Sequence, residues 1–141
     1  MHCWCLMSNH MHLIASAKNH NLSDVLRDFK KFTSKSLITA IGENPQESRK
    51  GWMLEIFQSE GTKNSRNKKY QLWRQSLSRT KCGNNHPEQL YSPSFVYQKI
   101  NYIHNNPVEA GIVDHPWEYL YSSSRDYHYA KKCGLLDLNL L

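Results

Sequence analysis

The chain has 141 residues, of which 39% are hydrophobic and 21% are charged, and these proportions are typical of one globular domain. No apolar run approaches the roughly 18 residues that a membrane-spanning helix needs. The N-terminus lacks the apolar core of a signal peptide, because polar residues and histidines interrupt it. We therefore expect a single cytoplasmic domain over residues 1–141, without a membrane partner.

The formal net charge of the chain is +6, which favours an anionic partner, most commonly nucleic acid. The four cysteines include no Cys-x-x-Cys pair and do not follow the spacing of a disulfide framework. We expect all four to be reduced thiols; they are Cys3, Cys5, Cys82 and Cys133.

The chain opens with an apolar stretch that predicts a strand over residues 2–7, and Ser8-Asn9 is a plausible tight turn. A returning strand is expected over residues 10–16, with His10, His12 and Ile14 on one face; one long bent strand is the alternative. Natural domains rarely begin in the middle of a core. We therefore expect the chain to lack an upstream strand and helix.

Helical spacing of apolar residues predicts a first helix from Leu22 to Ile41, closed by Gly42. Asn44-Pro45 has the pattern of a helix start, which predicts a second helix from there to about Gln58. Two basic or glycine-containing loops, at 61–69 and 76–86, flank a short strand expected over Tyr70–Arg74.

A third helix is predicted over Ser94–Ala110, with an apolar stripe formed by Val96, Ile100, Ile103, Pro107 and Ala110. Pro107 lacks the amide hydrogen of a helical hydrogen bond, so the helix should kink or end near Asn106. Gly111 is then the stop signal. The remaining tail is rich in aromatic residues.

The pair His10 and His12 is the first candidate for chemistry. Residues at i and i+2 of a strand point to the same face, and neutral imidazole is the commonest side-chain ligand of metal ions. The pair therefore indicates a site for a divalent metal ion. The alternative is a pair of histidines on an edge strand without a ligand role.

Tyr102 is the second candidate, because it lies off the apolar stripe of the third helix, with Asn106 one turn further on and Lys99 adjacent. Asn106 has a carbonyl oxygen that would complete a metal site. The alternatives are a tyrosine at the edge of the core with its hydroxyl in water, and an asparagine that only forms a turn before proline.

Basic residues are the third candidate set. One group lies along a face of the first helix, and the other is interleaved with Tyr70 and Trp73. Basic groups bind phosphates and aromatic rings stack on unpaired bases, so this mixture suits single strands or hairpins; a solvated surface is the alternative. The candidate DNA-binding residues are Arg27, Lys30, Lys31, Lys68, Lys69 and Arg74.

Two blocks of the sequence together resemble the REP-associated tyrosine transposases, which belong to the single-tyrosine transposases with a His-hydrophobic-His motif. The first block is residues 7–14, which contains His10-Met11-His12. The second is residues 99–113, which contains Tyr102 and Asn105-Asn106-Pro107, followed by residues 121–127 with three consecutive serines. The resemblance covers nearly all of the chain.

The resemblance implies an α+β fold with a ferredoxin-like antiparallel sheet, helices packed on it, and a homodimer. It implies that His10 and His12 bind the metal ion, that Tyr102 is the nucleophile, and that Asn106 occupies the position of an amide third ligand. The implied activity is metal-dependent cleavage and rejoining of single-stranded DNA at hairpins of palindromic repeats, through a 5′-phosphotyrosine intermediate. Mg²⁺ or Mn²⁺ is the expected cofactor.

Two departures from the family are the absence of its first strand and helix before the histidine motif and an apparent insertion at residues 76–84. The sequence does not identify the base that would activate the tyrosine. Two other functions remain open: an inactive or domesticated module that binds DNA hairpins without cutting them, and a structural zinc site formed by Cys3, Cys5, His10 and His12.

Overall fold

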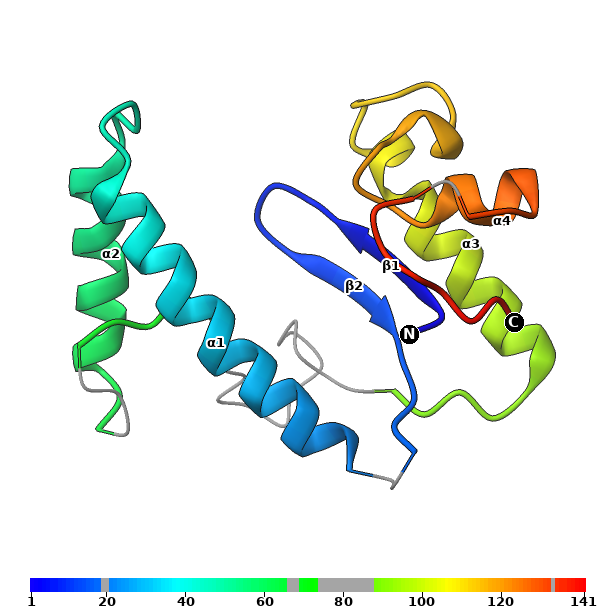
Figure 1. Ribbon diagram of the computed structural model, residues 1–141, viewed down its shortest axis with the longest axis horizontal. Coiled ribbons are helices and arrows are strands. Elements are labelled where there is room, and N and C mark those ends of the chain that lie inside the picture. The colour runs from blue at the N-terminus through cyan, green and yellow to red at the C-terminus, as the bar shows by residue number, and fades with distance from the viewer. Residues whose placement is uncertain (19–20, 66–68, 74–87, 133) are drawn as a thin grey trace. The chain divides into compact units, whose positions relative to one another are not determined.

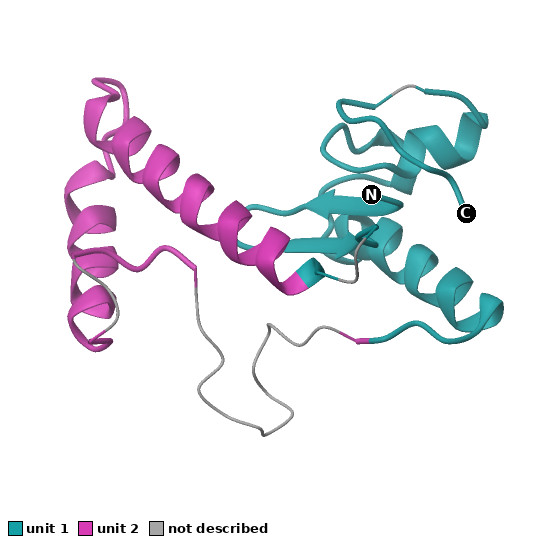
Figure 2. Cartoon of the chain, turned by 60° about the horizontal axis from the view of Figure 1, so that its bottom comes forward, with its two compact units in different colours: residues 1–22, 89–141 teal, residues 23–88 magenta. Residues whose placement is uncertain are grey.

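The computed structural model describes residues 1–18, 21–65, 69–73, 88–132 and 134–141. It has the expected α+β composition, with a two-stranded antiparallel sheet and four α-helices in the described part. The chain divides into two compact units, residues 1–22 with 89–141 and residues 23–88 (Figure 2), and each is described by itself. Among the described helices, none combines the length and the apolar character that a membrane span requires.

The N-terminal residues form a β-hairpin, as predicted. Strand β1 (Cys3–Leu6) pairs antiparallel with β2 (Met11–Ile14), and the amide of Met7 donates to the carbonyl of His10 at 2.9 Å to close the turn. The alternative of one bent strand is therefore excluded. The second strand is shorter than expected, because His10 lies in the turn, before β2 begins.

The other edge of β1 is also paired. The amide of Leu6 donates to Tyr121 (2.8 Å) and the amide of Ser123 donates to Trp4 (2.9 Å), which makes a bridge between Cys5 and Ser122. Both edges of β1 therefore have backbone partners, and this satisfies the polar groups of a strand that is almost entirely buried.

Helix α3 (Pro93–Glu109) packs against one face of the hairpin (Figure 1). Ser92 caps its start by accepting the amide of Phe95 at 3.3 Å. Ile100 and Ile103 of the helix form a core cluster with apolar residues of the hairpin, and because the strand period is two, alternate residues share this face. The hairpin contributes Cys3, Cys5, Met7 and Ile14.

The helix does not end near Asn106, because α3 continues through Pro107 to Glu109. Proline removes a single amide donor, and the next bond is intact, with Ala110 donating to Asn106 at 3.0 Å. The ring of Pro107 is fully buried, and its apolar packing offsets the lost bond. Gly111 ends the helix, as expected.

The termination at Gly111 has the geometry of a Schellman motif. Gly111 adopts a left-handed conformation with φ of 67°, Ile112 donates to Pro107 and Gly111 donates to Val108, both at 2.9 Å. A short 3₁₀ turn, η1 (Pro116–Glu118), and helix α4 (Ser124–Tyr129) follow. The C-terminal segment then returns to the first residue, where Asn139 donates to Met1 at 3.0 Å.

A buried polar network joins α3 to β1 and to the segment before α4. The Ser123 hydroxyl oxygen accepts the amide of Trp4 at 2.9 Å and lies 2.8 Å from Nε2 of His104. His104 is only 7% exposed. Burial lowers its pKa to about 4, although the nearby Asp126 acts in the opposite direction, so the ring is neutral at pH 7.

The second unit contains α1 (Leu22–Glu43), apart from its first residue, and α2 (Lys50–Thr62). The first helix begins as predicted but continues past Gly42. The second begins later than Asn44-Pro45 predicts, because the Asn44 side chain accepts the amide of Gln46 at 3.0 Å and so forms a turn. Residues 70–73 are not a strand, and Arg74 and the loop at 76–86 lie outside the described residues.

Helix α1 has the predicted apolar stripe, but among the described residues of its unit nothing covers it fully. No residue of α1 is buried, and Phe32 is 71% exposed. Trp73 contacts the stripe: its ring lies 6.0 Å from that of Phe29, and its Nε1 donates to Thr33 at 2.9 Å.

We predict opposite effects for the same substitution at two glycines that both have open space around them. Gly111→Ala should lower the free energy of unfolding by about 1–2 kcal/mol, because a β-carbon strains the left-handed conformation. Gly42→Ala, inside α1, should raise helix stability by up to about 1 kcal/mol. Urea unfolding followed by circular dichroism measures both, and equal signs would contradict the assignment of the helix ends.

We further predict that His104 makes the protein sensitive to acid. Its pKa is lower in the folded chain, at about 4, than its ordinary value of 6.5, so the unfolded chain binds the proton more readily between these values. Stability should therefore fall as the pH decreases from 6.5 to 4, by up to about 3 kcal/mol.

The matched variant is His104→Gln, which keeps a nitrogen at the same distance along the side chain but cannot be protonated. Its unfolding free energy should depend less steeply on pH in that window than that of the unchanged chain. An equally steep dependence in the variant would show that other groups cause the acid sensitivity.

Candidate functional site

The two histidines of the motif lie side by side at the end of the hairpin. His10 is in the turn and His12 is in β2, where it lies directly opposite Cys5. The ring centroids of His10 and His12 are 4.9 Å apart. His12 therefore lies on the face of the hairpin that packs against α3, and His10 is exposed beside it.

Helix α3 brings Tyr102 to the same place. The Tyr102 ring lies 5.4 Å from the His12 ring, in an edge-to-face arrangement, although ninety positions separate the two residues in the sequence. Tyr102 remains 49% exposed, so about half of the residue is open to solvent. The prediction that Tyr102 lies off the buried stripe agrees with this exposure.

Asn106 follows one helical turn after Tyr102 and interacts with both residues. Its amide nitrogen donates to the backbone carbonyl of Tyr102 at 2.7 Å. Its side chain also raises the pKa of His12, so the amide lies close to the His12 ring.

The environment of His12 favours the neutral imidazole. Burial lowers its pKa most, the neighbouring His10 lowers it further, and the interaction with Asn106 opposes both only in part. A neutral ring with a free lone pair is the form that binds a metal ion.

The hydrogen bonds of the two rings fit a metal ligand role. Nδ1 of His10 lies 2.6 Å from the side-chain oxygen of Asn9, so Nδ1 carries the proton and Nε2 carries the lone pair. Nε2 of His12 is buried and has no hydrogen-bond partner in the described part of the chain. A buried nitrogen of this kind is costly, and a divalent cation near Asn106 would satisfy it.

The four-ligand zinc alternative is not formed. The described residues contain no group of three or more His, Cys, Asp or Glu side chains that would hold a metal ion. Cys3 and Cys5 are free thiols in the core, and burial raises their pKa to about 12 and about 11. Protonated, buried thiols are poor metal ligands. Cys82 and Cys133 lie outside the described residues.

The candidate DNA-binding residues all belong to the second unit. Arg27 forms ion pairs with Asp24 and, at 3.1 Å, with Asp28, so part of its charge is already neutralised. Lys31 and Lys69 are exposed and Lys30 is half-buried, while Lys69 also lies 5.0 Å from the centre of the Tyr70 ring. Lys68 and Arg74 lie outside the described residues.

His104 and Ser123 position α3 against β1, although the motifs of the sequence give neither residue a role. Helical spacing carried a signal for His104, because positions 100, 103, 104 and 107 share one face of the helix. No comparable signal exists for Ser123, whose partners at Trp4 and His104 are far away in the sequence.

Comparisons with protein-family models, with curated proteins and with solved structures gave no match.

We predict that His12 titrates below the ordinary histidine pKa of 6.5, because burial and His10 both lower its pKa. His10→Gln should raise the His12 midpoint, since it removes a neighbouring positive charge. Asn106→Leu should lower the midpoint, since it removes the amide whose interaction raises the His12 pKa. Nuclear magnetic resonance of the imidazole protons measures these shifts, and a midpoint at or above 6.5 in the unchanged chain would contradict this description of the site.

Proposed function

We propose that the protein is a metal-dependent nuclease and strand transferase for single-stranded DNA, with Tyr102 as its nucleophile. The observation that carries this proposal is the convergence of His10 and His12 from the hairpin with Tyr102 and Asn106 from α3. Side chains with this combination of chemistry are what a covalent phosphotyrosine mechanism requires. The resemblance of both sequence blocks to REP-associated tyrosine transposases supports the same activity.

We assign His10 Nε2, His12 Nε2 and the carbonyl oxygen of Asn106 as ligands of one divalent cation, Mg²⁺ or Mn²⁺. Two imidazoles favour Mn²⁺, whereas Mg²⁺ prefers oxygen ligands but is more abundant in cells. When bound, the cation would act as a Lewis acid on the non-bridging oxygens of the phosphate.

The Tyr102 oxygen attacks the phosphorus in this proposal. A bond forms between that oxygen and phosphorus, and the bond from phosphorus to the 3′ oxygen of the preceding nucleotide breaks. The phenol loses one proton and the departing 3′ oxygen gains one, so the step is balanced. The 5′-phosphotyrosine link preserves the energy of the broken bond, and attack by another 3′ hydroxyl reverses the step and joins strands.

The substrate we propose is a DNA hairpin with unpaired flanks, bound by a homodimer in a ferredoxin-like arrangement. The exposed basic residues of the second unit support an anionic partner. The apolar stripe of α1, which the described residues of its own unit do not bury, supports a homodimer, because a large apolar face of this kind is typical of an interface.

The decisive variant is Tyr102→Phe, which removes the attacking oxygen but retains the ring beside His12. With a labelled hairpin oligonucleotide and Mn²⁺, the unchanged chain should form a covalent adduct that survives denaturing electrophoresis, and the variant should form none while it binds the hairpin normally. Tyr97→Phe, on another side of α3, is the matched control and should retain the adduct.

An undiminished adduct in Tyr102→Phe would reject Tyr102 as the nucleophile. Hairpin binding by the unchanged chain without any cleavage would instead favour the alternative function, a hairpin-binding module that does not cut DNA.

A further inference from the structure

Helix α3 has a second face that the proposed reaction uses only in part. Phe95, Lys99, Tyr102 and Asn106 follow each other at spacings of four, three and four residues, which places them on one side of the helix. Tyr91, just before the helix, extends this row because its ring stacks on that of Phe95. We call these five residues the α3 stripe.

The start of the stripe is a pair of stacked aromatic rings. The ring centroids of Tyr91 and Phe95 are 5.2 Å apart with an interplanar angle of 23°. Tyr91 is 80% exposed, so one face of its ring is covered by Phe95 and the ring is otherwise open to solvent. Flat, exposed aromatic surface of this kind is costly in water and suits a stacking partner.

A cation lies next to the aromatic pair. Nζ of Lys99 is 5.1 Å from the centre of the Phe95 ring, which places a positive charge between the stacked rings and Tyr102. The stripe therefore presents, in order, an aromatic surface, a positive charge and the candidate nucleophile. Single-stranded nucleic acids are bound by this combination, with bases on the rings and phosphates near the charge.

We infer that the Tyr91–Phe95 pair is a stacking platform for an unpaired base of the DNA strand and that the α3 stripe leads this strand to Tyr102. This inference rests on the proposed function, because it takes Tyr102 as the nucleophile at the end of the α3 stripe. Seven residues separate Phe95 from Tyr102, which is about 10 Å along a helix. A stacked strand covers that length with about three nucleotides, so the stacked base lies about that far from the phosphate under attack.

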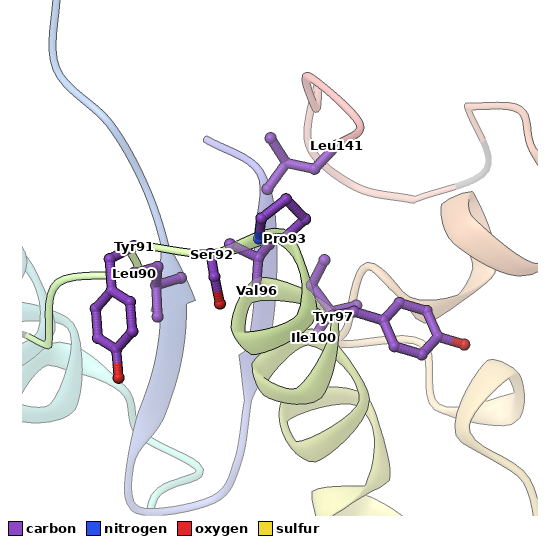
Figure 3. Close-up of a pocket in the computed structure, with 8 residues that line it drawn as sticks. All are labelled: Leu90, Tyr91, Ser92, Pro93, Val96, Tyr97, Ile100 and Leu141. Carbon is purple, nitrogen blue, oxygen red and sulfur yellow. The ribbon is translucent and has the colours of Figure 1, made fainter.

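Tyr91 also lines an apolar groove of about 550 Å³ at the start of α3, together with Leu90, Pro93, Val96 and Tyr97. In Figure 3 the rings of Tyr91 and Tyr97 point away from each other on either side of the first turns of the helix. Tyr97 is also exposed, at 68%, but lies outside the stripe. It is therefore a matched control that separates the platform from the groove.

The test measures binding of a fluorescein-labelled oligothymidylate of about 15 nucleotides by fluorescence anisotropy. Tyr91→Ala and Phe95→Ala should each weaken binding by at least about fivefold, the lower end of the effect of removing a stacking ring. Tyr91→Phe, which keeps the ring, and Tyr97→Ala should each bind within about twofold of the unchanged chain. Circular dichroism verifies that each variant is folded, and Tyr91→Ala alone decides the question if Phe95→Ala does not fold.

Three results would overturn the inference. Unchanged affinity in Tyr91→Ala would mean that the ring pair only stabilises the start of the helix. Equal losses in Tyr91→Ala and Tyr97→Ala would assign binding to the groove or to exposed aromatics in general. Tighter binding of oligouridylate RNA than of oligothymidylate would identify the strand as RNA.

The platform and the proposed function fail in different ways. If Tyr91→Ala binds oligothymidylate as tightly as the unchanged chain does, but both form the covalent adduct, the platform is wrong and the proposed function remains. If Tyr91→Ala weakens binding but the unchanged chain forms no adduct with Mn²⁺, the proposed function is wrong and the platform remains.

Discussion

The packing of α3 against one face of the β-hairpin is the constraint on which the candidate site depends. Alternation along the strands puts Cys3, Cys5 and His12 on that face, and burial of Ile100 and Ile103 against it fixes the rotation of the helix. Once this rotation is fixed, Tyr102 has a single place to lie, beside His12. The hydrogen bonds of His104 and Ser123 supply directional contacts that apolar packing alone lacks.

Burial has two effects in this unit. It removes apolar surface from water and so stabilises the fold, and it lowers the pKa of both His12 and His104. Nε2 of His104 has a hydrogen-bond partner in the Ser123 hydroxyl, whereas Nε2 of His12 has none in the described part of the chain. The two histidines of this unit thus differ in hydrogen bonding, and His12, whose Nε2 has no partner among the described residues, lies beside the exposed Tyr102. This contrast separates a structural histidine from a candidate ligand.

The two sides of α3 have different roles. One side, with Ile100, Ile103, His104 and Pro107, is buried and holds the helix in place. The other carries the α3 stripe, which combines the exposed ring of Tyr91 stacked on the half-buried Phe95, a positive charge and Tyr102. The continuation of the helix through Pro107 matters for both sides, because a break at Asn106 would detach the amide from Tyr102.

Local patterns in the sequence were sufficient for the hairpin, for the start of α1, for α3 and for its end at Gly111, because turn, cap and periodicity signals act over a few residues. They failed where local signals competed: Asn44-Pro45 resembles a helix start, but the side chain of Asn44 forms a turn instead. Family resemblance and residue chemistry named His10, His12, Tyr102 and Asn106 without their positions in space. Only the tertiary structure brings these residues together, leaves Nε2 of His12 without a partner among the described residues and places His104 against Ser123. These features arise from packing between segments that are about twenty to a hundred and twenty residues apart in the sequence. Periodicity carries no information over that range, because contact there depends on how the elements pack.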